Sequence, residues 1–284
     1  MQFIENDSEK SVAISVLNNI DTSFSSHSRL SKLALYMSKL NVKKITIDFS
    51  KVNFIASNQF AILGCILNAY IVRCPETQIY FLNLNKKLAG TIRKNGFYKH
   101  LGFEKLPDTY NTVIPYTIFN IDEINEFEKY ILLRIFNRAD IPQMSEMAKS
   151  NIMDNILEIF NNVKEHTHSN KVFTCGQYFP RSSLLYLTVV DSGETIPYNV
   201  HMHFSNINNA PPSNTLEWAI IAGHSTRIAE TPGGLGLSLL KDFIELNKGS
   251  LYIVSGNETY EKNGDKERYR YMEYPFMGTI VTVA

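Results

Sequence analysis

Three glycines within four positions constrain the second half of this chain more than any other feature of its sequence. The segment Thr231–Leu240 reads TPGGLGLSLL, so Gly233, Gly234 and Gly236 stand directly before an apolar run that predicts a helix over Leu237–Leu246. Glycine tolerates positive φ and close backbone approach, so successive N–H groups can point at phosphate oxygens, and the helix amino end favours an anion. The segment therefore predicts a phosphate-binding turn. The plainer alternative is a flexible turn that enters a helix.

A polar row follows one face of a helix predicted over 145–165. Glu158, Asn162 and His166 recur there at intervals of four residues. The amide oxygen of Asn162 can coordinate a hard cation such as Mg²⁺, and Glu158 can accept a proton from a nucleophile held beside that ion. An ordinary solvated helix face is the alternative interpretation. The opposite face is apolar and holds Met153, Ile156, Leu157 and Phe160.

An acidic turn follows the predicted strand Leu184–Val190, whose sequence is LLYLTVV. Asp191 stands at the end of the strand and Gly193 follows two residues later. The Asp191 carboxylate can accept a hydrogen bond from the exocyclic amine of adenine, whereas it would repel the oxygen that guanine carries there. The turn therefore predicts ATP in preference to GTP. An ordinary Asp-Ser-Gly turn is the alternative.

In this order the three segments resemble the GHKL superfamily of ATP-binding domains, which includes gyrase B, the heat-shock chaperone, histidine kinases and MutL. The resemblance covers residues 145–284. Glu158–Asn162 (EIFNN) is similar to the family's N box, Asp191–Ile196 (DSGETI) to its Asp-x-Gly-x-Gly box, and Gly233–Leu237 (GGLGL) to its second glycine box. It implies an α/β sandwich of the Bergerat type with a mixed, mainly antiparallel sheet.

The resemblance also implies roles for individual residues. Asn162 would hold Mg²⁺, Glu158 would act as the base, and a mobile lid would lie between about Tyr198 and Pro232. The chain departs from the family pattern at Thr195, where a glycine is usual. Arg227 within the lid is either a phosphate ligand or a solvated charge. The residues expected to contact ATP or ADP are Asn162, Asp191, Gly193, Thr195, Ser225, Thr226, Gly233, Gly234, Leu235, Gly236, Leu237 and Thr279.

The first half reads as a small α/β domain. Lys44–Phe49 and Gln78–Leu84 predict strands, and 57–72 and Leu88–Asn95 predict helices, the second one ended by Asn95-Gly96. This β-α-β-α order suits a domain of about 100 residues.

The segment Lys44–Leu67 resembles the core of a STAS domain, the fold of anti-sigma-factor antagonists. The resemblance covers roughly residues 1–115 and implies that this half docks a protein partner. Asn58 stands at the family's phosphorylated serine, which speaks against phosphorylation here. Ser57 is expected to cap the helix that follows it.

We therefore expect a two-domain α/β chain. A STAS-like domain spans 1–116, a connecting helix lies within 117–144, and a GHKL-type ATP-binding domain spans 145–284. Apolar residues at intervals of three and four predict the connecting helix over Asp122–Ile135. Further strands are predicted at Leu251–Ser255 and Thr279–Val283. The polar stretches Ser205–Asn214 and Glu258–Arg270 are predicted as loops.

Composition excludes several classes of protein. Lysine plus arginine equals aspartate plus glutamate at 28 each, so no nucleic-acid partner is expected. No apolar run is long enough to cross a bilayer and no signal peptide is expected. Cys65, Cys74 and Cys175 are few and odd in number, which favours the cytoplasm. His168, His201 and His203 with Cys175 form no convincing zinc pattern, and no Gly-x-Ser-x-Gly elbow occurs.

Two classes of function follow. The first is a Mg²⁺-dependent ATPase or a protein serine kinase of the anti-sigma-factor type, which the spacing of Asn162 and His166 resembles in particular. The second is a nucleotide-switched interaction module without significant turnover. No histidine lies between His100 and His166, so autophosphorylation of the sensor-kinase type is not expected. Besides ATP, the expected partners are a protein that docks on the STAS-like half and, as an alternative assembly, a second copy of the chain.

Overall fold

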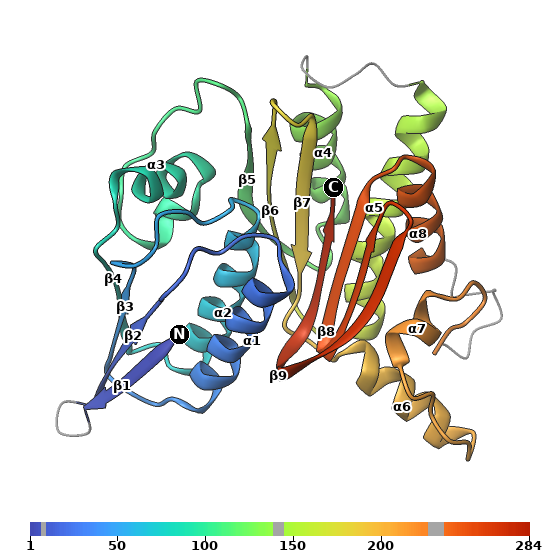
Figure 1. Cartoon of the computed structure of the whole chain (residues 1–284), viewed down its shortest axis with the longest axis horizontal. Helices are drawn as coiled ribbons and strands as arrows, with labels where there is room; N and C mark the ends of the chain where they lie inside the picture. The colour runs from blue at the N-terminus through green and yellow to red at the C-terminus, as the bar shows by residue number, and fades with distance from the viewer. Residues whose placement is uncertain (7–9, 139–144, 227–235) are drawn as a thin grey trace.

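The computed structural model describes residues 1–6, 10–138, 145–226 and 236–284 and arranges them in alternating layers of sheet and helix (Figure 1). A first sheet, formed near the amino terminus, is followed by the helices α1 and α2. A second sheet lies on the other side of these two helices, and the remaining large helices cover its far face. The two halves of the chain thus share one helical layer.

The first sheet is mixed. Strands β1 and β2 pair antiparallel, whereas β2 pairs with β3 and β3 with β4 in parallel. The parallel connections run through α1 (Phe24–Lys39) and α2 (Gln59–Arg73). The strand order is β1 (Gln2–Asn6), β2 (Ser11–Ser15), β3 (Lys44–Asp48) and β4 (Gln78–Leu82).

Helix α2 is enclosed on every side from Gln59 to Leu67, and its last turn is exposed. Each residue from Gln59 to Leu67 is buried. A helix that is apolar all round must be covered all round, and α2 achieves this by lying between two sheets. A single apolar core accordingly joins Ile47 of the first sheet, Phe60 of α2, and Phe173 and Val190 of the second sheet. Among the described residues, no helix is both long and apolar enough to cross a membrane.

The second sheet is antiparallel throughout, and each neighbouring pair of strands confirms this. Its order is β5 (Val113–Asn120), β6 (Lys171–Phe179), β7 (Leu184–Val190), β9 (Lys266–Val283) and β8 (Ser250–Asn263). One face contacts α1 and α2. The other packs a second apolar core that includes Phe127, Phe160 and Ile244.

The helices on this far face carry the candidate site. They are α4 (Ile124–Ile131) with a π-helical turn (Leu132–Phe136), α5 (Glu146–His166), α6 (Ile196–Asn206), α7 (Thr215–Ile220) and α8 (Gly236–Leu246). The first half adds α3 (Lys86–Asn95) and a 3-10 turn (Phe97–His100). Helix α5 begins at Ser145, whose hydroxyl accepts a hydrogen bond from the Ala148 N–H at 3.2 Å.

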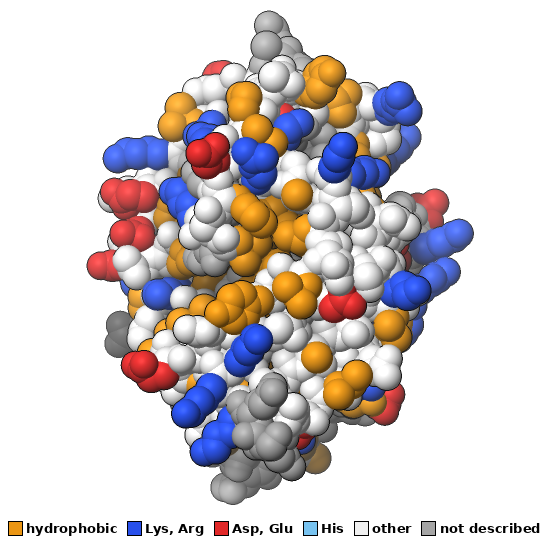
Figure 2. All heavy atoms as spheres, turned by 90° about the vertical axis from the view of Figure 1, so that its left-hand side faces the viewer, with side chains coloured by type: hydrophobic (Ala, Val, Ile, Leu, Met, Phe, Trp, Pro, Cys, Tyr) orange, Lys and Arg blue, Asp and Glu red, His pale blue; other side chains and the backbone are white. Residues whose placement is uncertain are grey.

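The outer face of the first sheet carries exposed hydrophobic and basic side chains. Figure 2 views this side of the molecule, where hydrophobic side chains gather among lysines and arginines. Ile4, Tyr80 and Leu82 are exposed on its strands, and the Lys44 ammonium lies 5.5 Å from the centre of the Tyr80 ring. The α1 and α2 layer packs against the opposite face of this sheet.

Most of the segments with a strong hydrophobic period form the predicted helices and strands. The strand Leu184–Val190 is confirmed with its bounds, and α3 ends at Gly96, whose φ of 90° is the left-handed conformation that glycine permits. The predicted loop over Glu258–Arg270 is wrong. This stretch forms a β-hairpin in which Glu261 pairs with Arg268 and Tyr260 with Tyr269. The many charged residues of this stretch are typical of an exposed loop, which is why the composition predicts a loop. Several of them are instead paired across the hairpin or buried.

The α/β architecture with one mixed and one antiparallel sheet agrees with the expected class. The second sheet begins at Val113, before the range assigned to the ATP-binding domain, because β5 pairs with β6. Helix α4 packs on this sheet through Phe127 and Ile131, and the π-helical turn packs on it through Ile135. The connecting segment therefore packs against the second sheet.

Candidate functional site

A pocket of about 400 Å³ lies on the face of the second sheet that points away from the first half. Successive residues of a strand point to opposite faces. Val189 of β7 lines the pocket, whereas its neighbour Thr188 faces α2 and binds Asn58. The sequence-predicted residues that line it are Glu158, Asn162, Asp191, Ser225, Thr226, Leu237 and Thr279.

Asp191 forms the deep end of the pocket. Its side chain is 1% exposed, and its Oδ1 accepts a hydrogen bond from the Gly193 N–H at 2.8 Å. The Asp191 N–H donates to the Thr279 carbonyl at 3.0 Å, which fixes the turn to β9. Burial raises the pKa of Asp191 to about 7, although the Gly193 N–H and the Thr167 hydroxyl act in the opposite direction. A carboxyl group of this kind changes charge near neutral pH.

Two glycines make room for this turn. A Cβ on Gly193 would lie 2.0 Å from the Thr167 carbonyl oxygen, at the end of α5. A Cβ on Gly278 would lie 2.1 Å from the Asp191 carbonyl oxygen, and the φ of Gly278 is 139°. Both positions therefore exclude larger residues because backbone segments meet there. Gly193 does not line the pocket itself.

Thr195 has a local role. It precedes α6 with a φ of −87°, and its hydroxyl accepts a hydrogen bond from the Tyr198 N–H at 3.2 Å. This is an N-cap, the position at which threonine and serine are favoured. Thr195 is absent from the described pocket lining, so the structure does not bring it together with Asp191 and Asn162.

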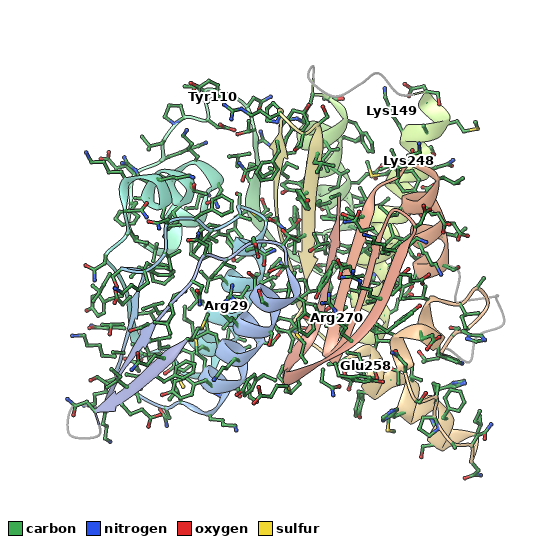
Figure 3. All side chains as sticks on the ribbon, viewed as in Figure 1. Arg29, Tyr110, Lys149, Lys248, Glu258 and Arg270 are labelled. Atoms are coloured by element: carbon green, nitrogen blue, oxygen red, sulfur yellow. The ribbon has the colours of Figure 1, made fainter. Side chains whose placement is uncertain are left out.

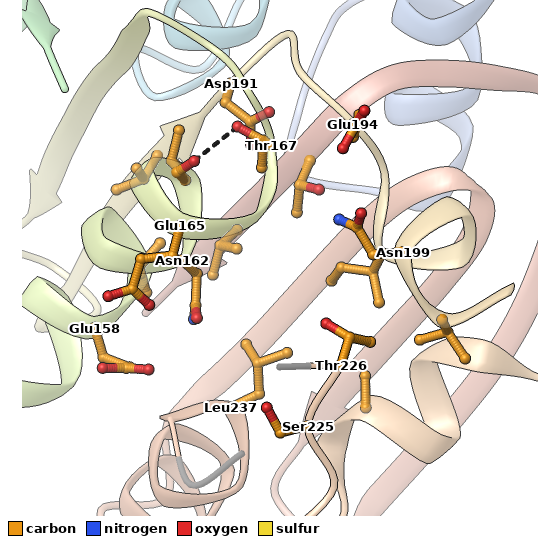
Figure 4. Close-up of a pocket in the computed structure, with 18 of the residues that line it drawn as sticks. Glu158, Asn162, Glu165, Thr167, Asp191, Glu194, Asn199, Ser225, Thr226 and Leu237 are labelled. Atoms are coloured by element: carbon orange, nitrogen blue, oxygen red, sulfur yellow. Dashed lines mark hydrogen bonds between the residues drawn. The ribbon is translucent and has the colours of Figure 1, made fainter. Parts of the chain in front are cut away.

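Glu158 and Asn162 come from the same face of α5, as their spacing predicts, and Figure 4 shows both side chains at the pocket wall. The apolar side of the helix, including Met153 and Phe160, is buried in the second core. The His166 side chain lies outside the described residues. The helix therefore fixes the carboxylate and the amide by packing on its opposite side.

The charge of the lining is one-sided. Among the described residues, the pocket contains no lysine or arginine, whereas it contains the carboxylates of Asp154, Glu158, Glu165, Asp191 and Glu194. No group of three or more histidine, cysteine, aspartate or glutamate side chains in the described part of the chain could hold a metal ion by itself. A cation here would therefore need ligands from the bound molecule or from water.

The remaining wall comes from α7 and the turn after it. Trp218 stacks on His224 with ring centres 4.8 Å apart and planes inclined by 23°. The His224 Nδ1 lies 2.9 Å from the Trp218 carbonyl oxygen, and both side chains line the pocket beside Ser225 and Thr226. Sequence reasoning missed Trp218 and Asn199. The one available signal was that Trp218 is the single tryptophan of the chain.

The glycine-rich segment is only partly described. Gly236 is the first residue of α8, and Leu237 lines the pocket. Arg227, Gly233, Gly234 and Leu235 lie outside the described residues.

The residues singled out in the first half lie elsewhere. Ser57 does not cap α2: its hydroxyl accepts a hydrogen bond from Asn95 at 3.3 Å and lies 3.6 Å from the Cys175 sulfur. The first N–H groups of the helix bind backbone carbonyls instead, including those of Ala56 and Ser57. Asn58 is fully buried against Thr188. The second sheet of the same chain thus covers this face.

Two residues of the zinc alternative, His168 and Cys175, contact other side chains. His168 lies 2.9 Å from Glu194, and Cys175 is buried at the contact with Ser57. Burial raises the pKa of the Cys175 thiol to about 12, so the thiolate needed for zinc binding is disfavoured.

A scan against models of protein families finds none that matches this chain, and a search of curated proteins finds no match either.

Proposed function

We propose that this protein binds ATP with Mg²⁺ and acts on the terminal phosphate, as an ATPase or as a protein serine kinase of the anti-sigma-factor type. The observation that carries the proposal is the gathering of Glu158, Asn162, Asp191 and Thr279 around one pocket, although they come from α5, the end of β7 and β9. A volume of about 400 Å³ suits a nucleotide-sized ligand.

The deep end of the pocket suits adenine. Val189, Val281 and Ile196 offer apolar surface for a flat base, and Asp191 offers a buried acceptor among them. An ionised Asp191 would accept a hydrogen bond from the exocyclic amine of adenine, and this contact would discriminate against guanine.

The open end suits a phosphate chain only when a cation is present. The described lining is acidic, so a triphosphate would be repelled without a divalent ion to neutralise it. Asn162 fits this ion because Mg²⁺ is usually held by one or two protein oxygens together with substrate phosphates and water. Bound Mg²⁺ would neutralise the phosphate oxygens near Asn162.

Glu158 supplies a base at the same end. It would take a proton from water or from a serine hydroxyl, whose oxygen attacks the terminal phosphorus while the bond to the bridging oxygen breaks and ADP leaves. This role separates the enzyme from the second candidate, a nucleotide-switched interaction module. One observation favours the second candidate. Cys65 of α2 lies close enough to Asp191 and Ser192 to interact with both, so the half expected to dock a partner directly contacts the turn at the end of the pocket.

Titration calorimetry of the full chain with ATP, ADP and GTP tests the proposal, each with Mg²⁺ and with a chelator. Tighter binding of ATP and ADP than of GTP, and loss of ATP binding in the chelator, would support it. Equal affinity for adenine and guanine nucleotides would overturn the adenine assignment. Turnover of labelled ATP, with and without candidate protein substrates, distinguishes the enzyme from the switch.

A further inference from the structure

Glu258 is a buried carboxylate in a stretch whose composition suggests an exposed loop. It lies on β8, is 5% exposed, and stands where the β8–β9 hairpin meets the α6–α7 region (Figure 3). One carboxylate oxygen accepts three hydrogen bonds: from the Thr215 N–H at 2.9 Å, the Thr215 hydroxyl at 2.9 Å and the Leu216 N–H at 2.8 Å. Burying a charge is costly unless it is hydrogen-bonded in this way.

These three bonds hold the start of α7. The helix has only 6 residues, too few to be stable without tertiary contacts. Asn214 caps it by accepting a hydrogen bond from the Glu217 N–H at 3.0 Å, and Tyr271 of β9 donates to the Ser213 carbonyl at 2.8 Å. The hairpin thus anchors α7 at its first turn.

The other end of α7 forms the pocket wall. Trp218 and His224 stack there, and the chain continues directly into Ser225 and Thr226. Because Trp218 lies one helical turn after Thr215, a change in the placement of the first turn of α7 would move the Trp218 ring. The contact between Glu258 and Thr215 is therefore coupled to the shape of the pocket, although Glu258 itself does not line it.

We infer that Glu258 is a positioning residue of the nucleotide pocket, which it shapes by fixing the Trp218–His224 wall through α7. The inference rests on the proposed function, and it names a determinant of that site outside the three motifs. An apolar residue could fill the same space on β8, but it would leave two N–H groups and a hydroxyl unpaired. The carboxylate therefore places α7 as well as filling space.

The single tryptophan makes the inference testable without ATP. In nucleotide-free protein, Glu258→Gln keeps the shape of the side chain but removes its charge, and Trp218 emission should shift to longer wavelength as the stack on His224 loosens. Glu258→Ala should give a larger shift, and Thr215→Val a smaller one, whereas Thr215→Ser should resemble the wild type. Glu273→Gln changes an exposed carboxylate on β9 and serves as the matched control.

ATP binding gives the second measurement, at a temperature where circular dichroism shows every variant to be folded. Glu258→Gln should weaken binding roughly tenfold, because weaker bonds to the start of α7 leave the Trp218–His224 wall less well placed for the ligand. Unchanged Trp218 emission, or ATP affinity equal to that of Glu273→Gln, would overturn the inference. Failure of the wild type to bind ATP would instead overturn the proposed function, while the emission of the nucleotide-free variants still decides whether Glu258 fixes the wall.

Discussion

The Asn58 side-chain amide donates a hydrogen bond to the Thr188 hydroxyl at 2.9 Å, although the two residues are 130 positions apart. The bond crosses from the start of α2 to the second sheet, and Thr188 continues it to Thr282 at 2.8 Å. Asn58 also donates to Thr22 at 3.1 Å. A buried polar row therefore joins the first half of the chain to the sheet that forms the pocket.

Replacing Asn58 by alanine should weaken this junction. The change leaves the buried Thr188 hydroxyl and the half-buried Thr22 hydroxyl without their amide partner, so we expect a loss of about 1–3 kcal/mol in the free energy of unfolding. Urea denaturation followed by circular dichroism measures it. Asn41→Ala, at an exposed position, should change stability by less than about 0.5 kcal/mol. Equal effects of the two substitutions would contradict the prediction.

His27 should make the protein sensitive to acid. It is fully buried, stacks on Tyr252 of the second sheet at 4.5 Å, and its Nδ1 lies 2.8 Å from the Ser23 carbonyl. Burial lowers its pKa to about 4, although Ser23 and Asp21 oppose the shift. The unfolded chain, with an ordinary pKa near 6.5, takes up the proton first. The contribution of His27 to stability is complete above pH 6.5 and is therefore lost as the pH falls towards 4.

The measurement is the urea midpoint between pH 7 and pH 4.5. His27→Phe keeps a ring against Tyr252 but cannot be protonated, so on acidification its midpoint should fall less, or rise more, than that of the wild type. The complete effect is on the order of 3 kcal/mol at pH 4. His201→Asn, at an exposed histidine, should retain the wild-type slope. A slope that is the same in all three proteins would show that His27 does not control the acid response.

Sequence patterns predicted the helices and strands that depend on neighbouring residues. They failed for elements whose structure depends on contacts with residues far away in the sequence. The alternation in β3 and the helical period in α5 gave correct elements. Strand β6 was missed because it is covered on both faces, with residues 172–176 all buried, so no alternation marks it. The short helix α7 has no period to detect, and its first N–H groups bind Glu258, 43 residues later.

The same distinction holds within the site. Glu158 and Asn162 share a helix face because of their spacing, and both line the pocket. Thr195 was expected beside the nucleotide from its place in a motif, but its hydroxyl caps α6. The motif order could not reveal that α2 covers the back of the sheet, because that contact depends on packing between the two halves.

Gly278 should tolerate no side chain. Gly278→Ala would place a methyl group against the Asp191 carbonyl, where 2.1 Å is available, and would impose an unfavourable φ of 139°. We expect a loss of roughly 2–4 kcal/mol in stability or displacement of the Asp191 turn. Gly90→Ala is the control, because nothing lies near its Cβ within α3, and it should be neutral or stabilising by up to about 1 kcal/mol. Thermal unfolding of both variants checks the contrast.

Asp191→Asn should raise stability and lower nucleotide affinity in the same protein. Because the folded-state pKa is raised to about 7, the folded carboxyl binds its proton more tightly than the unfolded one. The contribution of Asp191 to wild-type stability therefore falls as the pH rises from about 4 to about 7 and stays low above it, opposite in sign to the contribution of His27. The asparagine variant does not titrate at this position, so its stability should not show this fall between pH 5 and pH 8. If Asp191 is only structural, the variant should bind ATP like the wild type.

The substitution Asp191→Asn should have the opposite effect on nucleotide binding, which it should weaken. The side-chain amide introduced by Asp191→Asn cannot replace the carboxylate as acceptor for the adenine amine while it also accepts from Gly193, so ATP affinity should fall by about 1–3 kcal/mol at pH 8. Wild-type affinity should itself increase from pH 6 to pH 8 as Asp191 ionises. Calorimetry at the two pH values measures both effects. A variant that is less stable at pH 8 and also binds ATP more weakly would indicate general damage to the fold.

Glu158→Gln should separate binding from chemistry. The amide keeps the size of the side chain on α5 but cannot accept a proton, so we expect Mg²⁺-ATP to bind with nearly unchanged affinity while phosphoryl transfer or hydrolysis falls by about 10²-fold or more.

Glu165→Gln is the matched control, because it removes one negative charge from the same helix and the same pocket. It should retain turnover within a few-fold of the wild type. A similar loss in both variants would indicate that the charge of the pocket matters and that Glu158 is not the base. Equal turnover in the wild type and Glu158→Gln would favour the interaction module, in which nucleotide occupancy is transmitted through the packing of α2 behind Asp191.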